Sequence, residues 1–150
     1  MSKSLKNFVT IREALAKSSP RQLRLLFLSQ PWGRTMNYAS DTLESIRVKE
    51  KSINEFFLVI RTILQEQENL ANIPQRWSEV ENTLHNTLLR IQEEVDRAMK
   101  DNFDTPNALL YLMDLIRDTN KYIMENKERK GLLLRKIATY VTKVRKIFFL

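Results

Sequence analysis

The sequence predicts an all-α protein, in which a short helical N-terminal module precedes an antiparallel four-helix bundle. Only 2 Gly and 4 Pro occur in 150 residues, which is too few for a fold rich in strands and tight turns. Hydrophobic residues make up 43% of the chain. They recur at spacings of three and four, as on one face of a helix, and capping signals precede several of these segments. We therefore place the module at 1–38 and the bundle at 39–150.

Two short helices are expected in the N-terminal module. Thr10 and Glu13 have the spacing of a capping box, which predicts a short helix after Thr10. Ser19-Pro20 provides an N-cap followed by a proline at the first helical position, which predicts a second helix over 22–29. The residues expected on one face of this second helix are Leu23, Leu26 and Phe27.

Four longer amphipathic helices are expected in the bundle. The first is capped at Ser40, the second begins at the capping box of Ser78 and Glu81, and the third restarts at Thr105-Pro106 after a corner anchored by Phe103. The stripes expected to form the core are Leu43, Ile46, Ile53, Phe57, Ile60 and Leu64, widened by Phe56 and Ile63; Val80, Leu84, Leu88, Ile91, Val95 and Ala98; Leu109, Leu112, Ile116 and Ile123; and Leu133, Ile137, Val141, Val144 and Phe148.

Charge is distributed unevenly along the chain. The net charge of +7 divides into +6 over residues 1–38, −6 over 39–120 and +7 over 121–150. A basic block of this kind fits a polyanionic partner, but it is also what a solvated helix face looks like. Charge alone leaves both interpretations open.

Composition also excludes several classes of site. With no Cys and one His, the sequence offers no disulfide and no thiolate or multi-histidine metal site, so we predict no metal ligands. The longest apolar run, residues 56–60, is far shorter than the ~20 residues of a membrane span. We expect His85 to be a solvated helix residue. Trp32, Trp77 and Tyr140 could stack on bases, although packing is the simpler interpretation.

The first residues resemble a known signature. Ser2-Lys3-Ser4 is similar to the end of the KMSKS signature of class I aminoacyl-tRNA synthetases, and residues 5–11 narrow the resemblance to cysteinyl-tRNA synthetases of the eukaryotic cytosolic type. Residues 101–109 resemble a stretch of that family's DALR-type helical anticodon-binding domain. Residues 19–28, Trp32 and 36–38 resemble the family's connective segment near the inside of the tRNA L.

This resemblance implies a function. The family activates cysteine with ATP and magnesium and transfers it to tRNA(Cys) in the cytoplasm. Lys3 would be catalytic, stabilising charge on the departing pyrophosphate, and Ser2, Lys3 and Ser4 would bind ATP. From charge placement, and not from a matched motif, we also expect the basic residues of the last helix to contact tRNA. These residues are Arg135, Lys136, Lys143 and Lys146.

The resemblance also implies parts that these residues do not provide. Family members carry a Rossmann domain with a HIGH-type motif and a zinc site that holds the substrate thiol, and this sequence has neither. Because the signature lies well inside such enzymes, we expect the chain to be a C-terminal portion, inactive alone. Two alternatives remain: a stand-alone tRNA-binding module without catalysis, and a helical interaction protein with no RNA role. The sequence says nothing about oligomeric state.

Overall fold

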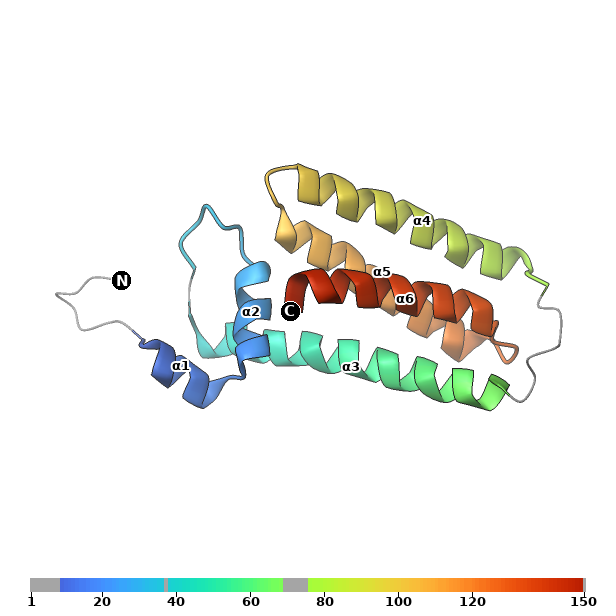
Figure 1. Ribbon diagram of the computed structural model, residues 1–150, viewed down its shortest axis with the longest axis horizontal. Helices are drawn as coiled ribbons and strands as arrows, with labels where there is room; N and C mark the ends of the chain where they lie inside the picture. Colours follow the sequence, from blue (N-terminus) through green and yellow to red (C-terminus); the bar gives the residue numbers. More distant parts are fainter. Residues whose placement is uncertain (1–8, 37, 69–75, 150) are drawn as a thin grey trace.

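A computed structural model of the chain describes residues 9–36, 38–68 and 76–149, with the side chains of Glu68 and Phe149 left out. The described part contains six helices and no strand, which confirms the all-α prediction (Figure 1). The helices are α1 (Ile11–Lys17), α2 (Pro20–Leu28), α3 (Ser40–Glu68), α4 (Glu79–Lys100), α5 (Thr105–Glu125) and α6 (Gly131–Phe149).

The four long helices, α3 to α6, extend along the long axis of the molecule, and each runs opposite to the one before it (Figure 1). They share one hydrophobic core, to which α6 contributes the fully buried side chains of Leu133, Leu134, Ile137 and Val141. The α6 stripe predicted from spacing is therefore confirmed. Because one face of α6 is held in the core, its opposite face is presented to solvent.

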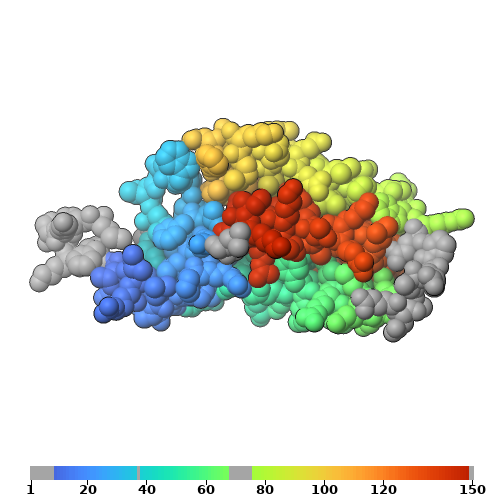
Figure 2. All heavy atoms as spheres, viewed as in Figure 1, coloured from blue at the N-terminus to red at the C-terminus, as the bar shows by residue number. Residues whose placement is uncertain are grey.

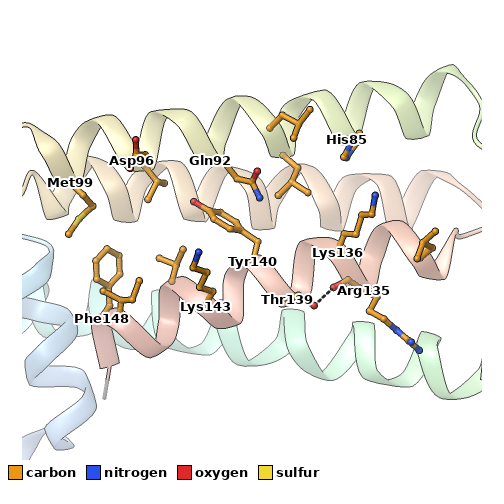
Figure 3. A pocket seen from close by; sticks show the side chains of 16 residues that line it. His85, Gln92, Asp96, Met99, Arg135, Lys136, Thr139, Tyr140, Lys143 and Phe148 are labelled. Atoms are coloured by element: carbon orange, nitrogen blue, oxygen red, sulfur yellow. Dashed lines mark hydrogen bonds between the residues drawn. The ribbon is translucent and has the colours of Figure 1, made fainter.

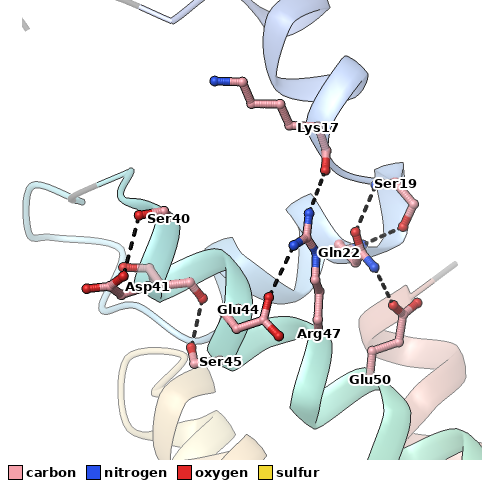
Figure 4. Close-up of polar contacts among 10 residues, drawn as sticks. Lys17, Ser19, Gln22, Ser40, Asp41, Glu44, Ser45, Arg47 and Glu50 are labelled. Carbon is pink, nitrogen blue, oxygen red and sulfur yellow. Dashed lines mark hydrogen bonds and ion pairs between the residues drawn. The ribbon is translucent and has the colours of Figure 1, made fainter.

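The short helix α2 packs against the long helices through a second cluster. Leu25 and Leu26 of α2 are buried with Leu43 and Ile46 of α3 and Leu109 of α5. Polar contacts reinforce this junction (Figure 4).

Two of those polar contacts join the N-terminal helices to α3. The Gln22 side chain donates to Glu50 at 2.8 Å, and the Arg47 guanidinium donates to the Lys17 carbonyl at 3.0 Å. The residues before α3 are thus tied to the long helices by both apolar and polar contacts.

Two predicted capping boxes are present. Glu13 accepts from the Thr10 N–H at 2.8 Å, and Glu81 accepts from the Ser78 N–H at 2.8 Å. Ser19 also caps α2 as predicted, since the Gln22 N–H donates to its hydroxyl at 3.2 Å.

The predicted apolar faces of α2 and α3 are rotated slightly from the observed ones. Phe27 is exposed and Leu25 is buried in its place. In α3, Phe56 is buried at the centre of the stripe, while Phe57 lies at its edge. Adjacent apolar residues made both choices ambiguous from spacing alone, since each lies about 100° from its neighbour around the helix. In α4, Val80 is exposed, because the buried position in the first turn is taken by Glu81.

The turn between α4 and α5 also differs from its prediction. Phe103 does not anchor the corner: its side chain is 66% exposed. Asn102 and Phe103 both have φ of 53°, a left-handed conformation that reverses the chain at the end of α4. The N-cap of α5 is Asp104 instead of Thr105, and its carboxylate accepts from the Asn107 N–H at 3.3 Å.

Candidate nucleic-acid interface

The solvent-facing side of α6 is strongly basic. The helix contains five Lys and Arg residues and no Asp or Glu. All four residues predicted to contact tRNA, namely Arg135, Lys136, Lys143 and Lys146, are exposed. Figure 2 shows α6, in red, at the surface between α4 above and α3 below. The structure thus brings the four predicted residues together on one accessible helix.

A shallow groove lies on each side of α6. The larger one, of about 900 Å³, lies between α4 and α6. The smaller one, of about 650 Å³, lies between α3 and α6. Arg135 and Lys143 line both grooves, Lys136 only the larger and Lys146 only the smaller. The basic side chains therefore form a ridge with a groove along each flank.

The charges of this ridge are not neutralised by neighbouring acids. Among the residues that the structure describes, no ion pair involves a cation of α6. Two of its cations contact aromatic rings instead. The Lys136 ammonium lies 5.2 Å from the Trp77 ring centre, and the Arg145 guanidinium lies 5.4 Å from that of Phe57. Such contacts leave the positive charge available to an anion.

His85 belongs to this surface, which corrects the expectation of a solvated residue. Its ring packs edge-on against Trp77 with the two ring centres 5.1 Å apart. Its Nδ1 atom is buried and has no hydrogen-bond partner in the described part of the chain. Trp77, His85 and Lys136 thus form one cluster at the end of the larger groove. Sequence spacing could not find it, because Lys136 of α6 is far along the chain from Trp77 and His85, at and near the start of α4.

Tyr140 lies in the larger groove with Lys136 and Lys143 on either side of it along α6 (Figure 3). Its side chain is partly buried. Burial and, to a lesser extent, the charge of Asp96 across the groove raise the pKa of Tyr140 to about 12. The hydroxyl is therefore protonated at neutral pH and can donate a hydrogen bond.

A buried polar network fixes the end of the helices where α6 begins. The Tyr122 hydroxyl donates to Glu81 at 2.9 Å and accepts from the Lys130 N–H at 3.1 Å. Ser78 adds two further hydrogen bonds to the Glu81 carboxylate. Burial would raise the pKa of Glu81, but the hydrogen bonds from Ser78 and Tyr122 outweigh it and lower that pKa below its usual value. A carboxylate thus ties the starts of α4 and α6 to the end of α5.

The predicted catalytic and ATP-binding residues, Ser2, Lys3 and Ser4, lie outside the described residues. The described residues contain no group of three or more side chains able to hold a metal ion. A zinc site of the family's kind would need thiolate or several imidazole ligands, and this sequence has no Cys and one His. The residues of this chain therefore do not fit a zinc ion. None of the described helices is long and apolar enough to cross a membrane.

Two family profiles match the sequence. Residues 1–48 match the profile described as "tRNA synthetases class I (C) catalytic domain", and residues 94–148 match the DALR domain. The second match covers the C-terminal third of α4, all of α5 and almost all of α6. It therefore includes Arg135, Lys136, Lys143 and Lys146.

Curated relatives match along nearly the whole chain. The cytoplasmic cysteine--tRNA ligase of Drosophila melanogaster is 43% identical over 99% of this chain and 20% of its own length. The proteins of the same name from Gallus gallus and Homo sapiens are each 40% identical, again over 99% of this chain and 20% of their own length. The chain therefore spans about one fifth of the length of these relatives. Along 99% of its length the chain is thus similar to a part of cytoplasmic cysteine--tRNA ligases, and its two profile matches are to domains of class I synthetase type.

Proposed function

We propose that this chain is part of a cysteine–tRNA ligase. Such an enzyme activates cysteine with ATP and magnesium and transfers it to tRNA(Cys) in the cytoplasm. The observation that carries the proposal is 43% identity, along 99% of the chain, to a relative named as that enzyme. Its contribution would be tRNA binding by the helical part at 39–150, linked to the KMSKS-like residues through the module at 1–38. The basic ridge of α6 supports this role because RNA affinity depends largely on phosphate neutralisation.

Within that enzyme, Lys3 would stabilise the negative charge of the departing pyrophosphate, and Ser2 and Ser4 would bind the ATP phosphates. An ammonium and two hydroxyls can supply charge-assisted hydrogen bonds to phosphate oxygens. Such a group accelerates the reaction when it binds charge that develops in the transition state. Lys3 cannot position cysteine and ATP by itself, so we expect the 150 residues alone to give no cysteine-dependent ATP–pyrophosphate exchange.

A chimera tests this proposal. The matching fifth of the Drosophila melanogaster ligase would be replaced by these 150 residues, and cysteinyl-tRNA formation would be measured. We expect activity, and we expect Lys3→Ala to lower kcat by about 100-fold or more because a transition-state contact is lost. Lys6→Ala, which removes the same charge three residues away, is the matched control and should keep most of the activity.

The main alternative is an RNA-binding module without catalysis, which the α6 cations, unpaired among the described residues, also favour. A chimera that folds and binds tRNA but forms no cysteinyl-tRNA would support that alternative. If the chain binds no tRNA at low salt, both the ligase proposal and the RNA-binding module are excluded.

A further inference from the structure

We propose that the groove between α4 and α6 receives one unpaired nucleobase, which stacks on Tyr140 while Lys136 and Lys143 contact the flanking phosphates. This inference rests on the proposed tRNA-binding function and deepens it, because it separates the place that reads an unstacked base from the surface that binds phosphate.

Tyr140 lies between two lysines on one face of α6. Lys136 precedes it by four residues and Lys143 follows it by three, so all three side chains share one face of the helix. Figure 3 shows the tyrosine ring in the groove, with a lysine on each side. An aromatic ring between two cations is the arrangement that suits a base and its two neighbouring phosphates.

The groove between α4 and α6 has the size and the apolar lining that suit a nucleobase. Its volume of about 900 Å³ is ample for a base, and sites for small ligands range over roughly 300–1,000 Å³. Most of its exposed lining is apolar, from side chains such as Leu88, Val95 and Met99. An apolar slot favours a flat, poorly hydrated base over a phosphate, which belongs on the lysines at the edge.

Polar groups in the groove can form hydrogen bonds with the edge of a base. Asp96 of α4 is already paired with Lys100 at 2.5 Å. The Gln92 amide faces the same groove and has no hydrogen bond to any described residue. It can therefore donate to and accept from the edge of a base. The Tyr140 hydroxyl, which stays protonated at neutral pH, provides a second donor.

Charge decides between RNA and an apolar protein segment as the occupant. One wall of the groove belongs to α6, which carries five cations and no acid, and Lys136 and Lys143 stand at its edge. These charges would oppose an uncharged apolar helix very little but would attract a polyanion strongly. The groove thus combines an aromatic slot with phosphate contacts in a single site.

The test compares an RNA hairpin that has an unpaired loop with a blunt duplex of the same stem. Binding of each to the full chain would be measured as a function of salt. We expect Tyr140→Leu to weaken hairpin binding by about tenfold or more with an unchanged salt slope, because base stacking and not a phosphate contact is lost. Duplex affinity should change less than twofold. Tyr140→Phe keeps the stacking ring and removes only the hydroxyl donor, so it should weaken hairpin binding by no more than a few fold.

The matched control is Tyr111→Leu, which removes another partly buried tyrosine, on α5. It should leave hairpin affinity unchanged, and circular dichroism would establish that all variants are folded. A hairpin carrying 2-aminopurine in its loop gives a second readout. Its emission should be quenched by the wild-type chain and should not be quenched by Tyr140→Leu.

Each contrary outcome identifies what has failed. If the wild-type chain binds neither RNA at low salt, the proposed function itself is wrong. If it binds both but Tyr140→Leu binds the hairpin as tightly as the wild type does, the base slot is wrong and an apolar protein segment is the better occupant. Equal losses for hairpin and duplex would mean that Tyr140 only supports the shape of α6, and would also overturn the inference.

Discussion

The basic face of α6 and the outer faces of α4 and α5 carry their charges in opposite ways. On α4 and α5, four of the five cations are paired along the helix with acids three or four residues away, as Arg97 is with Glu94 and Arg117 with Asp114, and Arg90 is the exception among the described residues. On α6, five cations have no acidic partner among the described residues. Exposed ion pairs stabilise a fold by only about 0–1 kcal/mol.

The difference indicates two uses of charge. Paired charges keep a helix surface soluble and nearly neutral, whereas a row of unpaired cations costs some self-repulsion and is useful when an anion binds. Variants that affect binding should therefore map to α6. Variants that affect stability should map to the polar groups that are satisfied inside the fold, above all Glu81.

The strongest way to break the comparison is to neutralise each face. The α6 set is Arg135, Lys136, Lys143 and Lys146, and the control set on α4 and α5 is Arg97, Lys100, Arg117 and Lys121. Changing the α6 set to Gln should lower tRNA affinity by about 100-fold or more, because the phosphate contacts of four cations are lost. Each lost contact should also reduce the slope of affinity against salt by about 0.7–0.9. The control set removes the same charge and should change affinity by only a few fold. Filter binding over a salt series measures both, and equal losses would contradict the account.

The next largest effect is expected on stability. Glu81→Gln removes the negative charge that accepts hydrogen bonds from Ser78 and Tyr122 in a buried site. We expect the free energy of unfolding to fall by about 2 kcal/mol, the order found when a buried polar network is broken. Glu79→Gln, two residues earlier and exposed, is the control and should change it little. Chemical denaturation measures both, and a Glu81→Gln variant as stable as the control would show that the network is unimportant.

The same carboxylate gives a pH test of smaller size. The folded-state pKa of Glu81 lies below the ordinary value of a glutamate, so its contribution to stability is fully present above that ordinary value and is lost as pH falls through the lowered pKa. The Tm difference between wild type and Glu81→Gln should thus be constant at neutral pH and shrink in acid. A difference that grows in acid would contradict the assigned direction of the pKa shift.

The smallest expected effect is a gain in stability. Phe103 is exposed and has φ of 53°, a conformation that glycine adopts without the steric cost of a Cβ atom. We expect Phe103→Gly to raise the free energy of unfolding by about 1 kcal/mol. Its tRNA affinity should stay unchanged, because Phe103 lines neither of the two grooves beside α6. A destabilised variant would instead assign Phe103 a packing role that its exposure does not indicate.

Helix positions were largely predictable from the sequence because their signals are local. The Thr10–Glu13 and Ser78–Glu81 pairs cap helices where expected, and the α6 stripe is buried as predicted. Burial was less predictable where two apolar residues are adjacent, as at Phe56 and Phe57. In such pairs the choice depends on which neighbouring helix each residue meets.

The candidate interface was predictable only in part. The four cations of α6 could be chosen because positive charge is concentrated in residues 121–150. The Trp77–His85–Lys136 cluster could not, because it depends on how α4 and α6 pack. Glu81 was expected only as a cap, and nothing local indicated that Tyr122, 41 residues later, would bury it.

Lysine acetylation footprinting of the wild-type chain, with and without tRNA, tests most directly whether α6 is the RNA-binding face. The lysines to compare are Lys136, Lys143 and Lys146 on α6 with Lys51, Lys100 and Lys121 on α3, α4 and α5. The latter three are exposed and ion-paired within their own helices. We expect tRNA to slow acetylation of the α6 lysines and to leave the other three unchanged. Protection of Lys100 or Lys121 without protection on α6 would contradict the account.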